Sequence, residues 1–323
     1  MAQPATSPPA EEFSGRFARI VDNVGQVVRG KHEQIRLSLI CLVAGGHLLI
    51  EDVPGVGKTS LAKALAASID CPFSRIQFTP DLMPSDVTGV NVFNASTASF
   101  EFRPGGVFAN VVLGDEINRA SPKTQSALLE AMEEQQVTVD NRTYKLPAPF
   151  IVIATQNPIE HAGTYPLPES ELDRFLMRIH MGYPDRESEL EILDTHGARD
   201  PVARLEPVAS GWDVLEMMAV ARSVFVAPGL KGYLVDLAEA TRSHPGVGMG
   251  MSPRATLHLL RAARARAAAE GRSYLLPDDV KALAHPVLDH RLSVALEGQA
   301  PGAASEALSE ILERLPVPRT ARE

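Results

Sequence analysis

An apolar run enters a glycine-rich turn in Leu48-Leu49-Ile50-Glu51-Asp52-Val53-Pro54-Gly55-Val56-Gly57-Lys58-Thr59-Ser60, and residues 61–66 continue with helical spacing. This order predicts a strand, a phosphate-binding loop and a helix. Gly55 and Gly57 allow positive φ and a close approach to phosphate oxygens, so that N–H groups and the helix N-terminus face the anion. We expect Lys58 to reach the β- and γ-phosphates and the Thr59 hydroxyl to hold Mg²⁺. The residues expected to contact the nucleotide are Val53, Pro54, Gly55, Val56, Gly57, Lys58, Thr59 and Ser60.

One position departs from the strict phosphate-loop pattern. The pattern places glycine five residues before Gly57, where this chain has Asp52. The alternative interpretation is an ordinary Gly-Pro turn before a helix, but that alternative leaves Lys58 and Thr59 unexplained in this register. We therefore keep the nucleotide site as the prediction.

Composition narrows the class of protein. The chain has 323 residues, which suggests about two domains, and its formal net charge of −9 argues against a broad nucleic-acid or anionic-membrane surface. Cys41 and Cys71 lie among apolar residues without metal-ligand spacing, so we expect buried thiols and no bound transition metal. Neither a membrane span nor a secretion signal is apparent, which predicts a cytoplasmic protein.

Two further strands are predicted to bring polar residues to the same site. Residues 110–116 form an apolar run that ends in Asp115 and Glu116, and residues 150–155 form a buried-type strand that leads to Asn157. We expect Asp115 to orient water on Mg²⁺ and Glu116 to activate the attacking water as a general base. Asn157 would hold the γ-phosphate or the lytic water; its alternative is a turn residue before proline.

The segments before and after these strands predict helices and two inserted hairpins. Apolar spacing over residues 13–28 predicts a helix that ends at Gly30, and this turn could pack on an adenine ring or simply join two helices. The proline-punctuated stretch 79–106 predicts a hairpin that lies either at the sheet edge or facing a substrate, and residues 135–146 predict a second hairpin. Beyond residue 187 the sequence predicts helices and no strand.

Arginines in the second half have less distinctive settings. Arg254 follows Ser252-Pro253 in the first turn of a predicted helix, where the helix dipole disfavours a cation unless an anion lies nearby. Arg174, taken alone, is more typical of a surface ion pair. The simplest interpretation of a further set is a solvated face, with nucleic-acid contact less favoured: Arg261, Arg264, Arg266 and Arg272.

These pieces, in this order, resemble the AAA+ ATPases and specifically the MoxR family, over about residues 25–286. The motifs that carry the resemblance are Glu51-Asp52-Val53-Pro54-Gly55-Val56-Gly57-Lys58-Thr59, Asp115-Glu116-Ile117-Asn118-Arg119-Ala120, residues 123–134, Ala154-Thr155-Gln156-Asn157-Pro158, residues 163–169 and Leu172-Asp173-Arg174-Phe175. Gly114 stands where the family usually has another residue, a departure that leaves the carboxylates intact.

The resemblance implies an α/β fold, with a five-stranded parallel sheet and an all-helical lid. Composition predicts a disordered lead at 1–12, and the domains expected after it are a nucleotide-binding domain at 13–186, a linker at 187–206 and the lid at 207–323. By the same resemblance, Asn157 is sensor 1, Arg174 is an arginine finger given to a neighbouring subunit, and Arg254 is sensor 2.

The function implied by the resemblance is a Mg²⁺-dependent ATPase ring, expected to be hexameric, that binds ATP and remodels or activates protein clients. Family members commonly work with von Willebrand factor A proteins. One rival is a magnesium-chelatase-like or DNA-translocating motor, although residues 79–106 hold only Arg103 as a cation. A rival of another class is a nucleotide-gated scaffold without turnover, against which the Asp115-Glu116 pair argues.

Overall fold

A central parallel sheet organises the structure, a computed structural model that describes residues 8–158, 164–195, 201–294 and 302–318. Five strands lie in the order β2-β5-β8-β1-β9, and every neighbouring pair is parallel. Their bounds are β1 Leu48–Glu51, β2 Phe73–Gln77, β5 Val111–Asp115, β8 Ile151–Gln156 and β9 Met177–Ile179. The predicted five-stranded parallel sheet is confirmed.

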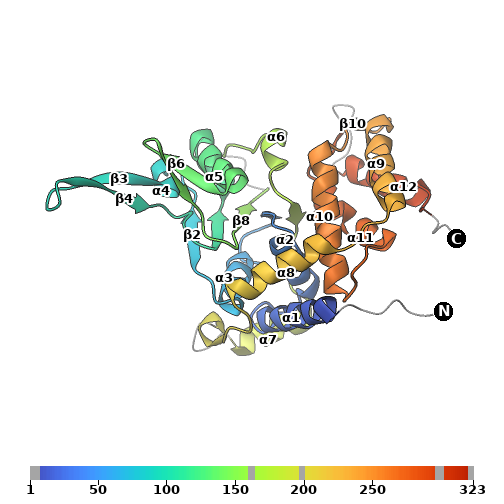
Figure 1. Cartoon of the computed structure of the whole chain (residues 1–323), viewed down its shortest axis with the longest axis horizontal. Helices are drawn as coiled ribbons and strands as arrows, with labels where there is room; N and C mark the ends of the chain where they lie inside the picture. The colour runs from blue at the N-terminus through green and yellow to red at the C-terminus, as the bar shows by residue number, and fades with distance from the viewer. Residues whose placement is uncertain (1–7, 159–163, 196–200, 295–301, 319–323) are drawn as a thin grey trace.

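Helices cover both faces of this sheet (Figure 1). Alternate residues of the central strands enter two separate cores, because successive side chains of a strand point to opposite faces. On β5, Val111 and Leu113 join the core beneath the first three helices, whereas Val112 packs toward α5. These helices are α1 Pro8–Gly25, α2 His32–Val43, α3 Lys58–Ser68 and α5 Pro122–Glu134. The result is a three-layer αβα domain.

Two antiparallel hairpins interrupt the domain, as the sequence predicted. The first, β3 Gly89–Asn94 with β4 Ser99–Pro104, extends away from the body in Figure 1, and the second is β6 Gln136–Val139 with β7 Arg142–Lys145. Phe102 stacks on Tyr144 with ring centroids 3.9 Å apart, which ties the two hairpins together. The stretch predicted as a proline-punctuated loop also holds a short helix, α4 Pro84–Thr88.

The second half of the chain forms the lid. Its helices are α8 Gly211–Ser223, α9 Pro228–Ser243, α10 Pro253–Ala269, α11 Pro277–Leu288 and α12 Ala303–Arg314. The expectation of no strand here was wrong in one detail, because β10 Val247–Met249 pairs with β11 Ser293–Val294. This two-stranded ribbon is too short for an alternating pattern to stand out. Of the short elements, η1 Ile117–Arg119 follows β5 and α6 Glu169–Leu172 precedes β9, whereas α7 Arg186–Thr195 and η2 Pro201–Arg204 lie between β9 and the lid.

The beginning of the chain differs from the expectation. Residues 8–12 of the predicted disordered lead lie in α1, whose Ala10 and Phe13 are buried, while residues 1–7 lie outside the described part. Proline is tolerated in a first helical turn, where its missing N–H has no partner to lose. The helix also ends at Gly25 and not at Gly30, which instead follows a short turn. The composition of residues 1–12 therefore gave no indication that a helix begins at Pro8 and buries Ala10.

Candidate functional site

The loop between β1 and α3 has the backbone of an anion-binding turn. Gly55 and Gly57 have φ of +88° and +93°, and a Cβ built at either would meet nothing within 4 Å. Gly57 precedes α3 without a side-chain cap, so the first N–H groups of the helix keep their bonding capacity. Lys58 Nζ donates to the carbonyl of Asp52 over 2.7 Å, which folds the lysine back across the loop. The open backbone, the lysine and the helix N-terminus together fit a phosphate chain.

Asp52, the departure from the strict pattern, has a structural role. Its Oδ1 accepts a hydrogen bond from the Val53 N–H over 2.9 Å, and its Oδ2 accepts one from the Gly182 N–H over 2.6 Å. The carboxylate thus joins the start of the loop to the chain leaving β9. A glycine at this position could make neither bond.

The two predicted carboxylates lie beside this loop. Burial lowers the pKa of Lys58, and the nearby carboxylates of Asp115, Asp52 and Glu116 oppose that shift. Thr59 lies in the first turn of α3 and offers a hydroxyl oxygen, while Asp115 ends β5 with a carboxylate. Hydroxyl and carboxylate oxygens are ligands that Mg²⁺ accepts, so these residues fit that ion.

Thr155 was missed as a site residue although it lies in a quoted motif. Its side chain is fully buried, and its hydroxyl donates to Asp115 Oδ1 over 2.6 Å. The Thr155 hydroxyl oxygen in turn accepts a hydrogen bond from the Glu116 N–H over 2.9 Å. One hydroxyl therefore fixes the end of β5, where Glu116 has φ of +57°, a left-handed conformation that is unfavourable for a residue with a Cβ.

Two residues of the edge strand β2 also hold the carboxylates. Arg75 Nη2 lies 2.6 Å from Asp115 Oδ2, and Gln77 Nε2 donates to Glu116 Oε2 over 2.9 Å. Arg75 also donates to Gln77 Oε1 over 2.8 Å, which links the two. Sequence reasoning missed both, although their two-residue spacing places them on the same face of β2.

The remaining residues predicted near the nucleotide lie at the same edge of the sheet. Asn157 is buried directly after β8, next to the end of β1. Gly30, with φ of +67°, lines a cavity of about 420 Å³ together with Asp185 and Ser188. A Cβ on Gly30 would lie 2.3 Å from Ser188 Oγ, so this close approach requires glycine. The cavity has room for a base, as the predicted adenine contact requires.

Arg174 and Arg254 lie elsewhere. Arg174 precedes β9, which runs parallel to β1, so it lies at the edge of the sheet opposite the phosphate loop that follows β1. The four residues of β1 span roughly 13 Å at about 3.3 Å per residue. Arg254, at the start of α10, lines the same cavity of about 470 Å³ as Arg174. The structure thus divides the predicted site residues into two groups.

A single carboxylate joins these two arginines. Arg174 Nε lies 3.4 Å from Glu133 Oε2, and Arg254 Nη2 pairs with Glu133 Oε1. Arg291, which is buried on the lid side, pairs with Asp173 at 2.7 Å and donates to the Leu176 carbonyl over 3.2 Å. Arg291 thereby attaches the lid to the αβ domain beside Arg174. Sequence reasoning did not identify Glu133 or Arg291.

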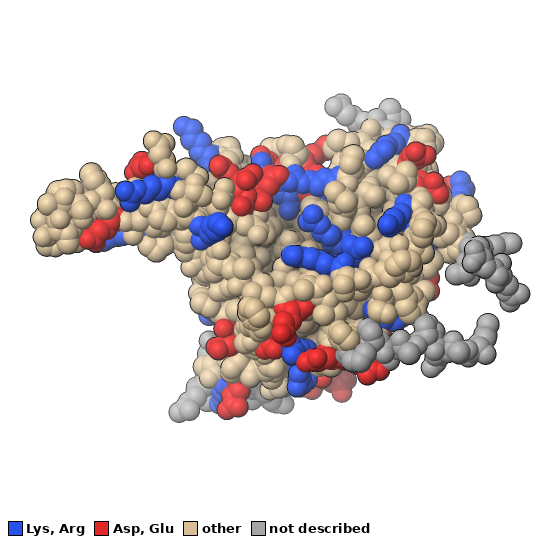
Figure 2. Space-filling model, in the orientation of Figure 1, with Lys and Arg blue, Asp and Glu red and all other residues tan. Residues whose placement is uncertain are grey.

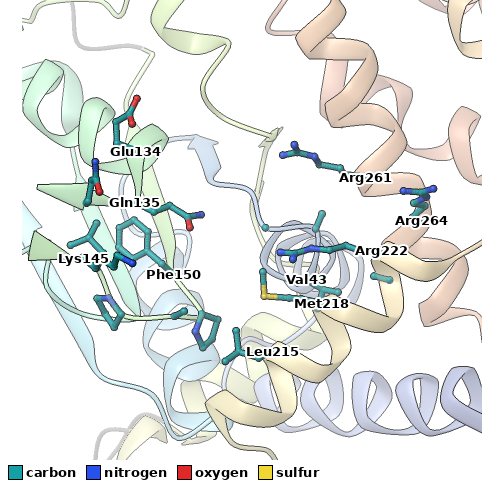
Figure 3. Close-up of a pocket in the computed structure, with 18 residues that line it drawn as sticks. Val43, Glu134, Gln135, Lys145, Phe150, Leu215, Met218, Arg222, Arg261 and Arg264 are labelled. Atoms are coloured by element: carbon teal, nitrogen blue, oxygen red, sulfur yellow. The ribbon is translucent and has the colours of Figure 1, made fainter.

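A larger basic cleft adjoins this cavity. Its volume is about 680 Å³, and it lies between the end of α5 with the second hairpin and lid helices α8 and α10 (Figure 3). Arg222, Arg261 and Lys145 line it, and Arg264 contributes a buried Nε that makes no hydrogen bond within the described part of the chain. Figure 2 shows Lys and Arg side chains gathered over α8 and α10. We name this space the basic cleft.

The arginines that were interpreted as a solvated face therefore separate into two pairs. Arg266 and Arg272 both reach Asp279, with nitrogen–oxygen distances of 3.7 and 2.6 Å. Arg261 and Arg264, from the same helix as Arg266, instead line the basic cleft. Helical spacing alone could not distinguish them, because the partner Asp279 comes from α11.

Known proteins resemble this chain over nearly its whole length. Residues 47–177 match the ATPase family associated with various cellular activities (AAA), and residues 239–315 match the AAA lid domain. The Bacillus subtilis protein YeaC, which is uncharacterized, is 48% identical over 95% of this chain and 97% of its own. Chaperone MoxR1 of Mycobacterium tuberculosis is 40% identical, with 93% of this chain and 82% of the relative covered.

Two further matches agree with these. Protein MoxR of Paracoccus denitrificans is 32% identical over 95% of this chain and 98% of its own. A crystal structure of a Cytophaga hutchinsonii protein superposes with a TM-score of 0.88 at 39% identity, covering 96% of this chain and 97% of that one. Across the described residues, no helix combines the length and apolar character that crossing a membrane requires.

Proposed function

Because the chain belongs to the MoxR family of AAA+ ATPases, we propose that it hydrolyses ATP with Mg²⁺ in a ring of its own copies and uses turnover to remodel or activate protein clients. The observation that carries the ring is the division of the site. Arg174 and Arg254 lie at the edge of the sheet opposite the phosphate loop, and this position supports a role at the nucleotide of another copy.

The nucleotide site supports the hydrolytic part of the proposal. Lys58 and the loop N–H groups would hold the phosphates, and Thr59 with Asp115 would hold Mg²⁺, which neutralises charge on the phosphoryl oxygens when bound. Glu116 would take the proton of the attacking water, and its pairing with Gln77 holds the carboxylate at one side of the site. Asn157 would orient the phosphate or the water.

Head-to-tail association follows from the two separated groups of residues. An interface that joins one edge of a copy to a different edge of the next is heterologous, and it closes into a ring when the rotation permits. We propose six subunits by resemblance to the family. The basic cleft adjoins the two arginines and would face the same neighbour, whose surface belongs to a chain with 40 acidic and 31 basic residues.

Client contact is assigned to the first hairpin. Phe93 and Phe100 are 55% and 69% exposed, and their rings meet at 5.4 Å near the end of the projecting β3–β4 ribbon. Exposed aromatic pairs favour a polypeptide over DNA, for which this hairpin offers only Arg103. By resemblance to the family, we propose that the protein works in the cytoplasm and that its protein clients or partners include von Willebrand factor A proteins.

The dependence of activity on protein concentration tests the shared site. If a neighbour completes each site, ATP hydrolysis per subunit rises with protein concentration in step with the mass measured by sedimentation. Activity per subunit that stays constant while the protein is monomeric would contradict the proposal. Chelation of Mg²⁺ should abolish turnover in the same assay.

A further inference from the structure

The carboxylate of Glu133 forms ion pairs with arginines from two domains. Arg174 belongs to the αβ domain, just before β9, and Arg254 belongs to the lid, in the first turn of α10. Glu133, the next-to-last residue of α5, offers one carboxylate oxygen to each arginine. The carboxylate therefore bridges two guanidinium groups that would otherwise repel each other.

This arrangement matches what a phosphoryl group requires. Guanidinium groups bind carboxylate and phosphate oxygens with the same geometry, so a site with two arginines around one anion can exchange one anion for the other. We propose that Glu133 is a positioning residue that holds Arg174 and Arg254 as a pair in the isolated subunit and releases them to the nucleotide phosphate of a neighbouring copy. This inference rests on the proposed function.

The contacts allow such an exchange. The side chains of Glu133 and Arg254 are 36% and 38% exposed, and ion pairs this accessible to water are individually weak. A terminal phosphate carries more charge and more acceptor oxygens than a carboxylate, so it is the stronger partner. Arg174 keeps a second carboxylate, Glu171 at 3.1 Å, which preserves its position when Glu133 leaves.

Glu133 should consequently compete with the neighbouring copy's nucleotide phosphate for the two arginines. Its two ion pairs stabilise the free subunit and are lost on association, so removing its charge raises the free energy of the free subunit more than that of the ring. Glu133→Gln should therefore lower the protein concentration at the midpoint of ATP-dependent association. We expect about a threefold to tenfold shift, in keeping with exposed ion pairs.

The experiment measures association in the Glu116→Gln background, which is expected to retain ATP. Sedimentation with Mg²⁺ and ATP gives the midpoint for Glu133→Gln and for a matched control, Glu130→Gln, which removes the same charge from an exposed position of α5. Glu133→Asp keeps the charge on a shorter side chain and should shift the midpoint in the same direction by less.

Each outcome decides a separate question. A Glu133→Gln midpoint equal to or above that of Glu130→Gln overturns the role of Glu133 and leaves the ring intact. If the Glu116→Gln protein does not associate with ATP at any concentration, the shared site itself fails and this inference fails with it. Circular dichroism of each variant verifies that a shifted midpoint comes from folded protein.

Discussion

The hydroxyl of Thr155 donates to Asp115 over 2.6 Å while it accepts from the backbone of Glu116, so one buried side chain sets the position of both carboxylates. The two strands that carry them, β8 and β5, are hydrogen-bonded neighbours. The Mg²⁺ ligand and the general base of the proposed mechanism thus share one anchor. Their geometry depends on a residue that touches neither nucleotide nor water in the proposal.

Thr155→Val should disturb hydrolysis more than nucleotide binding. Valine has a similar shape without the hydroxyl, which leaves a buried carboxylate oxygen and the Glu116 N–H without this partner at a cost of about 1–3 kcal/mol. We expect kcat to fall by roughly tenfold to a hundredfold. The Mg²⁺ concentration needed for half-maximal activity should rise. Thr155→Ser keeps the hydroxyl and should stay near the parent. Equal loss in both variants would assign Thr155 to packing alone.

Lys58→Ala should abolish tight ATP binding, because in the proposed site this half-buried lysine would neutralise phosphate charge. Lys63→Ala removes the same charge from the same helix and should bind normally. Since burial lowers the pKa of Lys58, affinity of the parent should decline with rising pH before an ordinary lysine with a pKa of 10.5 would lose its proton. Calorimetric titration across alkaline pH measures both effects. Tight binding by Lys58→Ala would remove the phosphate-loop assignment.

The sequence predicted the parts of the site that one chain segment defines. The loop around Lys58 and the carboxylates after β5 follow from local order, because the carboxyl ends of parallel strands meet at one edge of a sheet. Arg75 and Gln77 could not be found this way, since their role depends on β2 lying next to β5. The pairing of Arg254 with Glu133 likewise depends on how the lid packs against α5, which local patterns do not encode.

His47 should make folding stability depend on pH. Its Nδ1 accepts from the Val152 N–H and its Nε2 donates to the Met132 carbonyl, both at 3.0 Å, so the buried ring is neutral; burial lowers its pKa from 6.5 to about 4. Below pH 6.5 the unfolded chain takes up a proton here that the folded chain does not. Stability should therefore fall between pH 6.5 and about 4, by at most about 3 kcal/mol from this group.

His47→Gln tests this dependence. Glutamine can still donate and accept but does not titrate, so the slope of unfolding free energy against pH should decrease by about one proton in that window. His32→Gln, at an exposed position, serves as the control. Urea denaturation at several pH values gives the slopes, and an unchanged slope in His47→Gln would rule out the group as a contributor.

Reversing charge in the basic cleft should weaken the ring. Arg222 and Arg264 make no ion pair with any residue that the structure describes, so a neighbouring copy is their expected partner. The double variant Arg222→Glu, Arg264→Glu should raise the association midpoint by roughly tenfold or more, because like charges then oppose each other. Lys231→Glu, exposed on α9, is the control. Equal midpoints would place the cleft outside the interface.

Mixing two inactive variants tests whether Arg174 acts on a neighbour. Arg174→Ala should bind ATP yet lose most hydrolysis, as loss of an arginine finger does in related chemistry. Glu116→Gln should also bind ATP and turn it over on the order of 10²-fold more slowly. Neither result alone separates action within a subunit from action between subunits.

The mixture separates them because each variant keeps what the other lacks. An Arg174→Ala subunit retains Glu116 in its nucleotide site, and an adjacent Glu116→Gln subunit retains the arginine at the opposite edge of its sheet. Pairs in this order rebuild complete sites, so ATPase activity should return in mixtures that sedimentation proves to co-assemble. If activity stays at the level of the separate variants at every ratio, a covalently linked dimer of a parent subunit and a subunit that carries both substitutions distinguishes the causes. Activity in that dimer would mean that Arg174 serves its own subunit, because the neighbour of each intact Glu116 site then supplies no arginine. An inactive dimer would mean that Arg174 acts on a neighbour and that the ring requires consecutive intact sites.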